Sequence, residues 1–123
     1  MSRNSVDLKS AIKEIQKLKK QFYSDLLIPG DQFSFNEPLA KALRVADFME
    51  LGELFALDAL KRNESCGGHF REEFQTKEGE AMRNDKEFTF VSAWEYDKII
   101  ENSTLHKEKL LFDNVELKNR SYK

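Results

Sequence analysis

Residues 36–62 read NEPLAKALRVADFMELGELFALDALKR, and this stretch decides the fold. Asn36 is a good N-cap and Pro38 fits a first turn, so we predict a helix from there to about Arg62. Its apolar residues form two stripes, one of Leu39, Leu43, Ala46, Met49, Leu57 and Leu60, the other of Val45, Phe48, Leu51 and Phe55. A helix that is apolar on two sides needs two partners to cover it.

The first partner is the segment from Val6 to Leu27, which we predict to be an amphipathic helix. Its apolar residues recur at three- and four-residue intervals: Leu8, Ile12, Ile15, Leu18, Phe22 and Leu26. The opposite side carries a lysine stripe, which is typical of a solvated helix face rather than a nucleic-acid surface: Lys9, Lys13, Lys17 and Lys20. Pro29 and Gly30 end the helix. The second partner must come from the C-terminal half, from another copy of the chain, or from sequence not present here.

The composition limits the classes of function. The chain has 123 residues, a net charge of −2 and one cysteine, Cys66. The balanced charge argues against a nucleic-acid partner, and a single cysteine excludes an internal disulfide and fits a reducing compartment. No apolar run approaches the roughly 18 residues of a membrane span, and the first residues lack the apolar core of a secretory signal. We therefore expect no nucleic-acid binding and no direct membrane insertion.

The C-terminal half has a different character. Residues 63–69 form a turn-rich link, and residues 70–87 are acidic with little periodicity, which predicts an extended connection over other structure. Residues 88–96 (FTFVSAWEY) are dense in aromatic and β-branched side chains and predict a strand. A mostly polar loop then leads to a second predicted strand, residues 105–115, in which His106 alternates with apolar neighbours. Residues 116–123 form a polar tail.

The predicted fold is mainly α with a small β part. It consists of two long antiparallel helices, an incomplete three-helix bundle, followed by an extended region with a two-stranded hairpin. We divide the chain into a helical hairpin, residues 1–63, and a second part, residues 64–123, that holds the extended loop, the β-hairpin and the tail.

One constellation is dense enough to carry chemistry: Arg62-Asn63-Glu64-Ser65-Cys66-Gly67-Gly68-His69-Phe70-Arg71-Glu72-Glu73. Cys66 and His69 have the spacing of half a zinc site, but the chain has no second cysteine. Cys66 also suggests a thiolate nucleophile with His69 as its base, yet nothing here supplies an oxyanion hole or a third member. The paired glycines suggest a phosphate cradle, but such loops precede a helix and this pair follows one.

A structural interpretation fits this constellation better. Glycines just past a helix end are expected to provide a left-handed C-cap and to let backbone approach another surface closely. We expect His69 to be a partly buried donor with satisfied hydrogen bonds, and Trp94 to belong to the core. The charged residues are predicted to anchor an interface through paired hydrogen bonds: Arg62, Glu64, Arg71, Glu72 and Glu73. We assign no catalytic, cofactor-binding or metal-binding residue to the chain.

The stretch from Arg62 to Glu72 resembles the R-K-E-S-R-G-A-H-x-R-x-D signature near the end of succinate dehydrogenase and fumarate reductase flavoproteins. The Leu- and Ala-rich helix before it, the strand with Trp94, the strand opening Leu105-His106-Lys107 and the ending Arg120-Ser121-Tyr122 are similar to that family in the same order. Two departures from the pattern matter, Cys66 for its arginine and Gly68 for its alanine. L-aspartate oxidase and adenylylsulfate reductase share a related signature, but the continuation after His69 favours the first family. The family signature here comprises Arg62, Glu64, Ser65, Cys66, Gly67, Gly68, His69, Arg71 and Glu72.

The resemblance implies a C-terminal piece of a larger enzyme. The parent subunit would interconvert succinate and fumarate through covalently attached FAD and pass electrons to an iron–sulfur subunit that serves a membrane quinone site. The residues for flavin, substrate and proton transfer lie upstream of this region in the family, so this chain alone is expected to be inactive. Its partners would be the flavin domain of the same subunit and the iron–sulfur subunit, in the cytoplasm and peripheral to the inner membrane.

The resemblance also implies that the chain starts at the second helix of a small bundle, so that one covering helix and the flavin domain are missing. An apolar surface should then be exposed, and we expect the isolated chain to pair with a second copy. The alternatives are a free-standing interaction module with no redox role, and a thiol or metal enzyme at Cys66.

Overall fold

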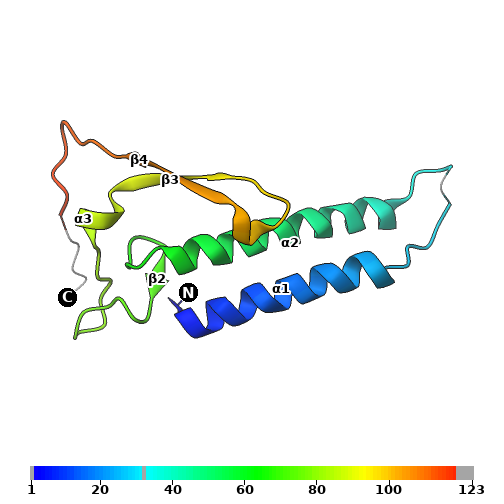
Figure 1. Cartoon of the computed structure of the whole chain (residues 1–123), viewed down its shortest axis with the longest axis horizontal. Coiled ribbons are helices and arrows are strands. Elements are labelled where there is room, and N and C mark those ends of the chain that lie inside the picture. The colour runs from blue at the N-terminus through cyan, green and yellow to red at the C-terminus, as the bar shows by residue number, and fades with distance from the viewer. Residues whose placement is uncertain (1, 32, 119–123) are drawn as a thin grey trace.

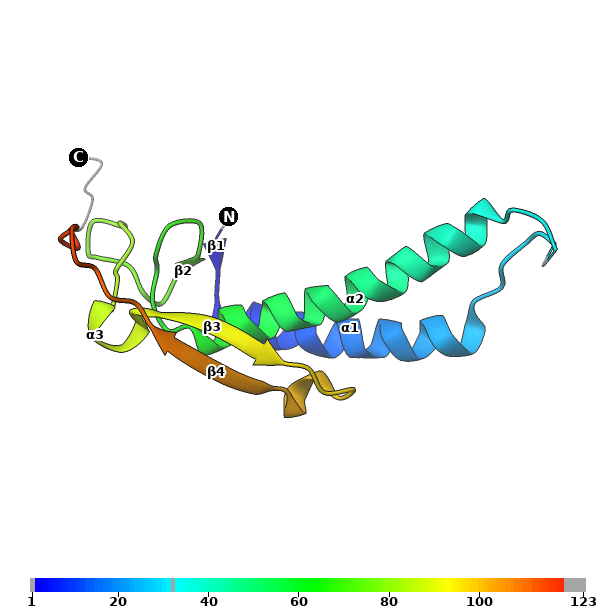
Figure 2. The same cartoon turned by 90° about the horizontal axis from the view of Figure 1, so that it is seen from above.

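The fold is a helical hairpin that carries a short β-ribbon along one side. A computed structural model describes residues 2–31 and 33–118 of the chain. Helices α1 (Ser5–Asp25) and α2 (Glu37–Lys61) run antiparallel side by side, and strands β3 (Phe90–Glu95) and β4 (Thr104–Lys109) lie against α2 (Figures 1 and 2). This confirms the predicted fold class. No helix in the described part of the chain combines the length and apolarity needed to cross a bilayer.

The helix starts follow from local capping. The Asn4 side chain accepts a hydrogen bond from the Asp7 amide at 2.8 Å, and Asn36 accepts one from the Leu39 amide at 3.0 Å, so each helix begins where a side chain satisfies a free backbone N–H. Helix α1 begins one residue and ends two residues before the predicted bounds, because the backbone of Leu26 is already extended. All four residues of the predicted lysine stripe are exposed.

A small apolar core joins the two helices and the β-ribbon. Ile12 of α1, Leu57 of α2 and Ile100 pack together, and Trp94 lies against this cluster as predicted. Ile100 belongs to a 3₁₀ turn, η1 (Ile100–Asn102), within the segment that we predicted as a mostly polar loop. Its side chain is only 3% exposed, so this loop contributes an element of the core that the sequence pattern did not reveal.

The β-ribbon is shorter than predicted at its ends. Strands β3 and β4 pair antiparallel, with Phe90 opposite Lys109 and Glu95 opposite Thr104. Phe88, predicted to open the first strand, instead ends a short helix, α3 (Asp85–Phe88). Beyond β4 the described backbone adds one more bond to the ribbon, from the Leu110 amide to the Thr89 carbonyl (3.1 Å). Residues 110–115, predicted to be strand, therefore have no partner to pair with and are irregular.

A second, parallel strand pair was not predicted. Strand β1 (Ser2–Arg3) pairs with β2 (Phe70–Arg71), which lies in the segment that we predicted as an extended connection. This pair joins the first residues of the chain to the residues just after the glycine pair, as Figure 2 shows. The predicted ending Arg120-Ser121-Tyr122 lies outside the described residues.

The role of the 3₁₀ turn can be tested by a matched pair of substitutions. Ile100→Ala is expected to lower the free energy of unfolding by about 2–4 kcal/mol, because it opens a cavity in a small core. Ile99→Ala, at the 59% exposed neighbouring position, is expected to change it by less than about 0.5 kcal/mol. Urea unfolding followed by circular dichroism measures both, and equal costs for the two variants would contradict the assignment of Ile100 to the core.

Candidate functional site

The glycine pair forms the tip of a tight turn, not the cap of a helix. The amide of Cys66 donates to the His69 carbonyl at 2.8 Å and the amide of His69 donates to the Cys66 carbonyl at 3.0 Å, so Gly67 and Gly68 are the two central residues. Gly67 has a φ of +58°, the left-handed region that glycine adopts at low cost. The predicted glycine C-cap of α2 is therefore wrong, because the chain leaves the helix through an extended Arg62, four residues before the turn begins.

Arg71 is the centre of the polar network behind this turn. Its side chain is 1% exposed, and its Nη1 donates to the carbonyl of Ala59 at 2.7 Å and to that of Leu60 at 3.3 Å. Its Nη2 donates to the Ser5 hydroxyl at 2.7 Å, and its Nε donates to Glu73 at 3.2 Å. The guanidinium thus satisfies carbonyls at the C-terminal end of α2, where a cation also opposes the helix dipole, and joins them to the start of α1.

Ser65 and Arg71 fix the two arms of the turn to each other. Ser65 is fully buried, its hydroxyl accepts from the Arg71 amide at 2.8 Å, and the same hydroxyl donates to the Arg71 carbonyl at 3.1 Å. A hydroxyl that both donates and accepts has little unsatisfied polarity left, so its burial costs little. This pair sets where the turn emerges from the helix hairpin.

Arg62 and Glu64 connect the same turn to the β-ribbon. Glu64 is almost fully buried, receives a hydrogen bond from Arg62 Nε at 2.8 Å, and also accepts from the amide of Asn84 at 2.8 Å. The Arg62 guanidinium lies 5.7 Å from the ring centroid of Phe88 and 5.6 Å from that of Phe90, and donates to the Phe88 carbonyl at 2.9 Å. The buried carboxylate is thus paired and hydrogen-bonded, as burial of a charge requires.

His69 has both ring nitrogens engaged, and we expected it to be satisfied in this way. Its Nε2 lies 3.1 Å from the carbonyl of Arg62 and its Nδ1 lies 3.2 Å from Nη1 of Arg3. A carbonyl only accepts and a guanidinium only donates, so these contacts fit the tautomer with its proton on Nε2. The ring thus contacts Arg62 and Arg3, and Cys66 beside it is half-buried. Within residues 2–31 and 33–118, no three His, Cys, Asp or Glu side chains gather as a metal site.

The two glutamates after Arg71 bind the first residues of the chain. Glu72 accepts from the Ser2 hydroxyl at 2.8 Å and from the Asn4 side chain at 3.3 Å, and Glu73 accepts from the Ser5 amide. Hydrogen bonds from Ser5, through its side chain and its backbone, and then from Arg71 lower the pKa of Glu73 from 4.5 to about 2. The sequence pattern singled out neither Ser2 nor Ser5, since their partners lie 66 or more residues away in the chain.

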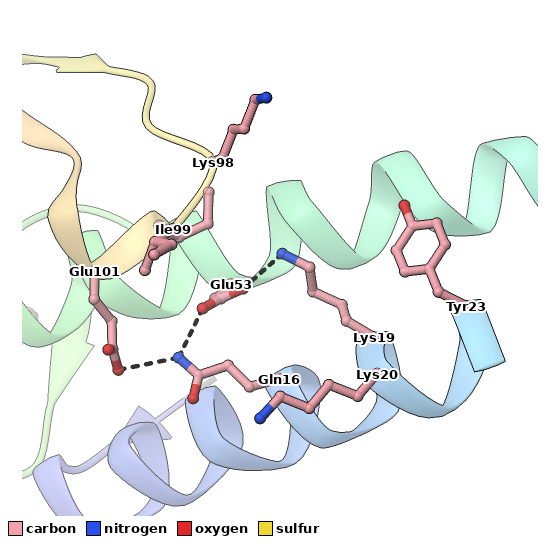
Figure 3. Close-up of a pocket in the computed structure, with 9 residues that line it drawn as sticks. Gln16, Lys19, Lys20, Tyr23, Glu53, Lys98, Ile99 and Glu101 are labelled. Carbon is pink, nitrogen blue, oxygen red and sulfur yellow. Dashed lines mark hydrogen bonds and ion pairs between the residues drawn. The ribbon is translucent and has the colours of Figure 1, made fainter.

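A cavity of about 580 Å³ lies between the two helices and the 3₁₀ turn, as Figure 3 shows. Its polar groups bind one another: Lys19 and Gln16 reach the buried carboxylate of Glu53 at 3.1 and 2.9 Å, and Gln16 also donates to Glu101 at 3.0 Å. Lys98 points away from these groups (Figure 3). These bonds hold the 3₁₀ turn against the helices, and the bonded polar groups are directed at one another rather than at a shared position that a ligand could occupy.

A second cavity, of about 460 Å³, lies beside the glycine turn. Its walls combine the apolar side chains of Leu8, Phe55 and Ala59 with the polar ones of Asp58 and His69. The apolar stripe of α2 leads directly into it through Phe55, whose side chain is 67% exposed. The glycine turn, this cavity and the stripe therefore form one continuous surface, which we call the open side of α2.

These features describe a small domain in which a polar network holds a turn and one apolar side of a helix is exposed. Residues 1–122 match the family model of the fumarate reductase flavoprotein C-terminal region, and the chain belongs to this family. The match confirms the resemblance that the signature suggested. Comparison with individually curated proteins found no match.

The contribution of Arg71 to the stability of the fold can be tested directly. Arg71→Met is expected to lower the free energy of unfolding by about 3–5 kcal/mol, because it removes the donor of the α2 carbonyls and the bonds that join them to Ser5 and Glu73. Lys13→Met, on the exposed side of α1, is the control and is expected to change the value by less than about 0.5 kcal/mol. A loss below about 1 kcal/mol for Arg71→Met in urea unfolding would show that the network is dispensable.

Because the pKa of Glu73 is lowered on folding, the stability of the fold should decrease at acidic pH. A carboxyl whose pKa falls on folding stabilises the fold above its unfolded value, so this contribution should be complete above pH 4.5 and disappear as the pH falls towards about 2. The side chain is 36% exposed and solvent screens it, so we expect a contribution of only about 1 kcal/mol. Glu73→Gln should flatten the pH dependence in this window, which thermal unfolding between pH 2 and 6 can measure, and an unchanged slope would contradict the assignment.

Proposed function

We propose that this chain is the docking part of a flavoprotein subunit whose parent interconverts succinate and fumarate. In this proposal the parent holds covalent FAD in its flavin domain and passes electrons to an iron–sulfur subunit, at the cytoplasmic side of the inner membrane. The chain itself stabilises the flavin domain and has no activity of its own. The observation that carries the proposal is the open side of α2, which lies next to the family signature.

The exposed apolar side chains support a docking role. Val45, Phe48, Leu51 and Phe55 lie on one side of α2, and Phe48 and Phe55 are each 67% exposed. Contiguous apolar surface of this kind on a small domain is typical of a site that another protein surface covers. The neighbouring cavity could receive a large anchor side chain from that surface, because its apolar floor and polar rim resemble the pockets that bind such residues.

The glycine turn supports the same location. A Cβ atom added at Gly67 or at Gly68 would meet no other atom of the described chain within 4 Å. Packing inside the domain therefore requires a glycine at neither position. The buried residues of the signature, namely Glu64, Ser65 and Arg71, together with the partly exposed Arg62, hold the turn from behind. In the proposal Gly67, Gly68 and the half-buried Cys66 and His69 lie at the contact with the flavin domain, while Glu72 orients the first residues of the chain.

Substitution at the turn tests this docking. Gly68→Trp is expected to leave the fold intact, since Gly68 lacks a positive φ and its Cβ would have free space, and to weaken binding to the separately expressed flavin domain at least tenfold. Ser10→Trp, on the exposed side of α1, is the control and should bind normally. Isothermal titration calorimetry measures both affinities, and unimpaired binding of Gly68→Trp would remove the turn from the interface.

The same experiment separates the proposal from its alternative. A free-standing interaction module would use the open side of α2 for an unrelated partner and would show no affinity for a succinate dehydrogenase flavin domain. The proposal also expects the purified chain to lack flavin absorbance and succinate-dependent electron transfer, both of which should appear only with the flavin domain present.

A further inference from the structure

We propose that, in the absence of the flavin domain, a second copy of the chain covers the open side of α2 in an antiparallel, two-fold symmetric pair. The sequence of α2 is self-complementary about the midpoint between Leu51 and Gly52. Phe48 lies as far before this midpoint as Phe55 lies after it, and both side chains are 67% exposed. A two-fold symmetric dimer requires such a self-complementary surface, because each contact between two residues across the interface occurs a second time with the two copies exchanged.

A two-fold axis at this midpoint brings four aromatic rings together. Phe48 of one copy faces Phe55 of the second copy, and the same contact recurs on the other side of the axis. Aromatic pairs of this kind stabilise an interface beyond the area that they bury. The β-ribbon borders the stripe without covering it: Trp94 of β3 lines a shallow pocket with Leu51 and Phe55, and Phe55 stays 67% exposed. Helix α1 lies on another flank of α2 (Figures 1 and 2).

The charges beside the stripe suit the antiparallel arrangement. Arg44 makes no ion pair with the described residues. Asp58 accepts a hydrogen bond from Trp94 Nε1 on one carboxylate oxygen at 2.8 Å, and its other oxygen has no hydrogen bond to the described residues. These two residues are nearly equidistant from the midpoint, so the two-fold axis sets Arg44 of each copy beside Asp58 of the other. A parallel pair would instead set Arg44 against Arg44 of the second copy and lose this complementarity.

One like-charge pair opposes the arrangement, but it is already neutralised. The axis brings Lys41 near Arg62 of the second copy. Lys41 lies 2.8 Å from Glu37 of its own helix, and Arg62 lies 2.7 Å from Glu64, so each cation has its own carboxylate. Their repulsion across the interface is therefore small.

The size of the stripe predicts a weak dimer. Each exposed phenylalanine contributes about 130 Å², if a ring side chain presents roughly 200 Å² in all, so the four rings bury about 500 Å². Val45 and Leu51 of both copies, which are 45% and 49% exposed, bring the total to about 800 Å², which is below the roughly 1,200–2,000 Å² of stable complexes. We expect a dissociation constant on the order of 10–100 µM.

The dimer and the docked state use the same side of α2 and exclude each other. The dimer nevertheless rests only on the pattern of α2 and not on the proposed function. A chain that stays monomeric yet binds the flavin domain would overturn the dimer alone, and a chain that dimerises but ignores the flavin domain would overturn the proposed function alone.

Sedimentation velocity across 5–500 µM tests the dimer. The wild-type chain should shift from monomer to dimer in this range, and Phe48→Asp should raise the dissociation constant at least tenfold. Leu43→Asp is the control, since Leu43 is 61% exposed but belongs to the other stripe, and should dimerise normally. Circular dichroism checks that both variants keep their helix content. A monomeric wild-type chain at 500 µM, or equal losses for the two variants, would overturn the proposal.

Cross-linking tests the orientation. In a Cys66→Ser background, Leu51→Cys places the only thiol near the two-fold axis, whereas Arg44→Cys places it two turns away. A short bis-maleimide should link the Leu51→Cys chains into dimers and leave Arg44→Cys mostly unlinked. Efficient linkage of Arg44→Cys would show a parallel pair instead and would overturn the antiparallel register.

Discussion

The structure depends on the burial of one guanidinium group. Arg71 lies where the C-terminal end of α2, the first turn of α1 and the segment after the glycine turn meet, and its side chain hydrogen-bonds to Ala59, Ser5 and Glu73 in these three segments. A buried cation is tolerable only when its donors are satisfied, so the positions of these three segments are fixed relative to each other. Ser65 and Glu64 extend the same constraint to the turn and to the β-ribbon.

This polar organisation compensates for a small apolar core. Among the residues that the structure describes, few apolar side chains are buried, and the buried members of the main cluster are Ile12, Leu57 and Ile100. Even the helix interface includes a charged group, since Glu53 is 3% exposed and is held by Lys19 and Gln16. Hydrogen-bonded networks of this kind specify where elements lie, whereas the apolar surface that remains exposed is available for another chain or domain.

The departures from the family pattern lie at the surface of the network and not at its centre. The buried members, Glu64, Ser65 and Arg71, agree with the family signature, while Cys66 and Gly68 replace its arginine and alanine. Gly68 is at the tip of the turn, and the thiol of Cys66 is half-buried and unbridged. The fold of the turn therefore does not need the missing arginine, and any difference that these replacements make concerns what approaches the turn from outside.

The sequence by itself determined the two helices, the Asn36 cap of α2 and the β-ribbon, because each depends on signals within a few residues, such as Asn36 before α2 or the alternation through Trp94. It also marked the signature residues as a group. Only the tertiary structure decided how that group works. The parallel pairing of Ser2 with Phe70, the bond between Ser5 and Arg71 and the burial of Ile100 join segments far apart in the chain. No local pattern encodes such contacts, because their stability arises only when the helix hairpin has already brought the segments together.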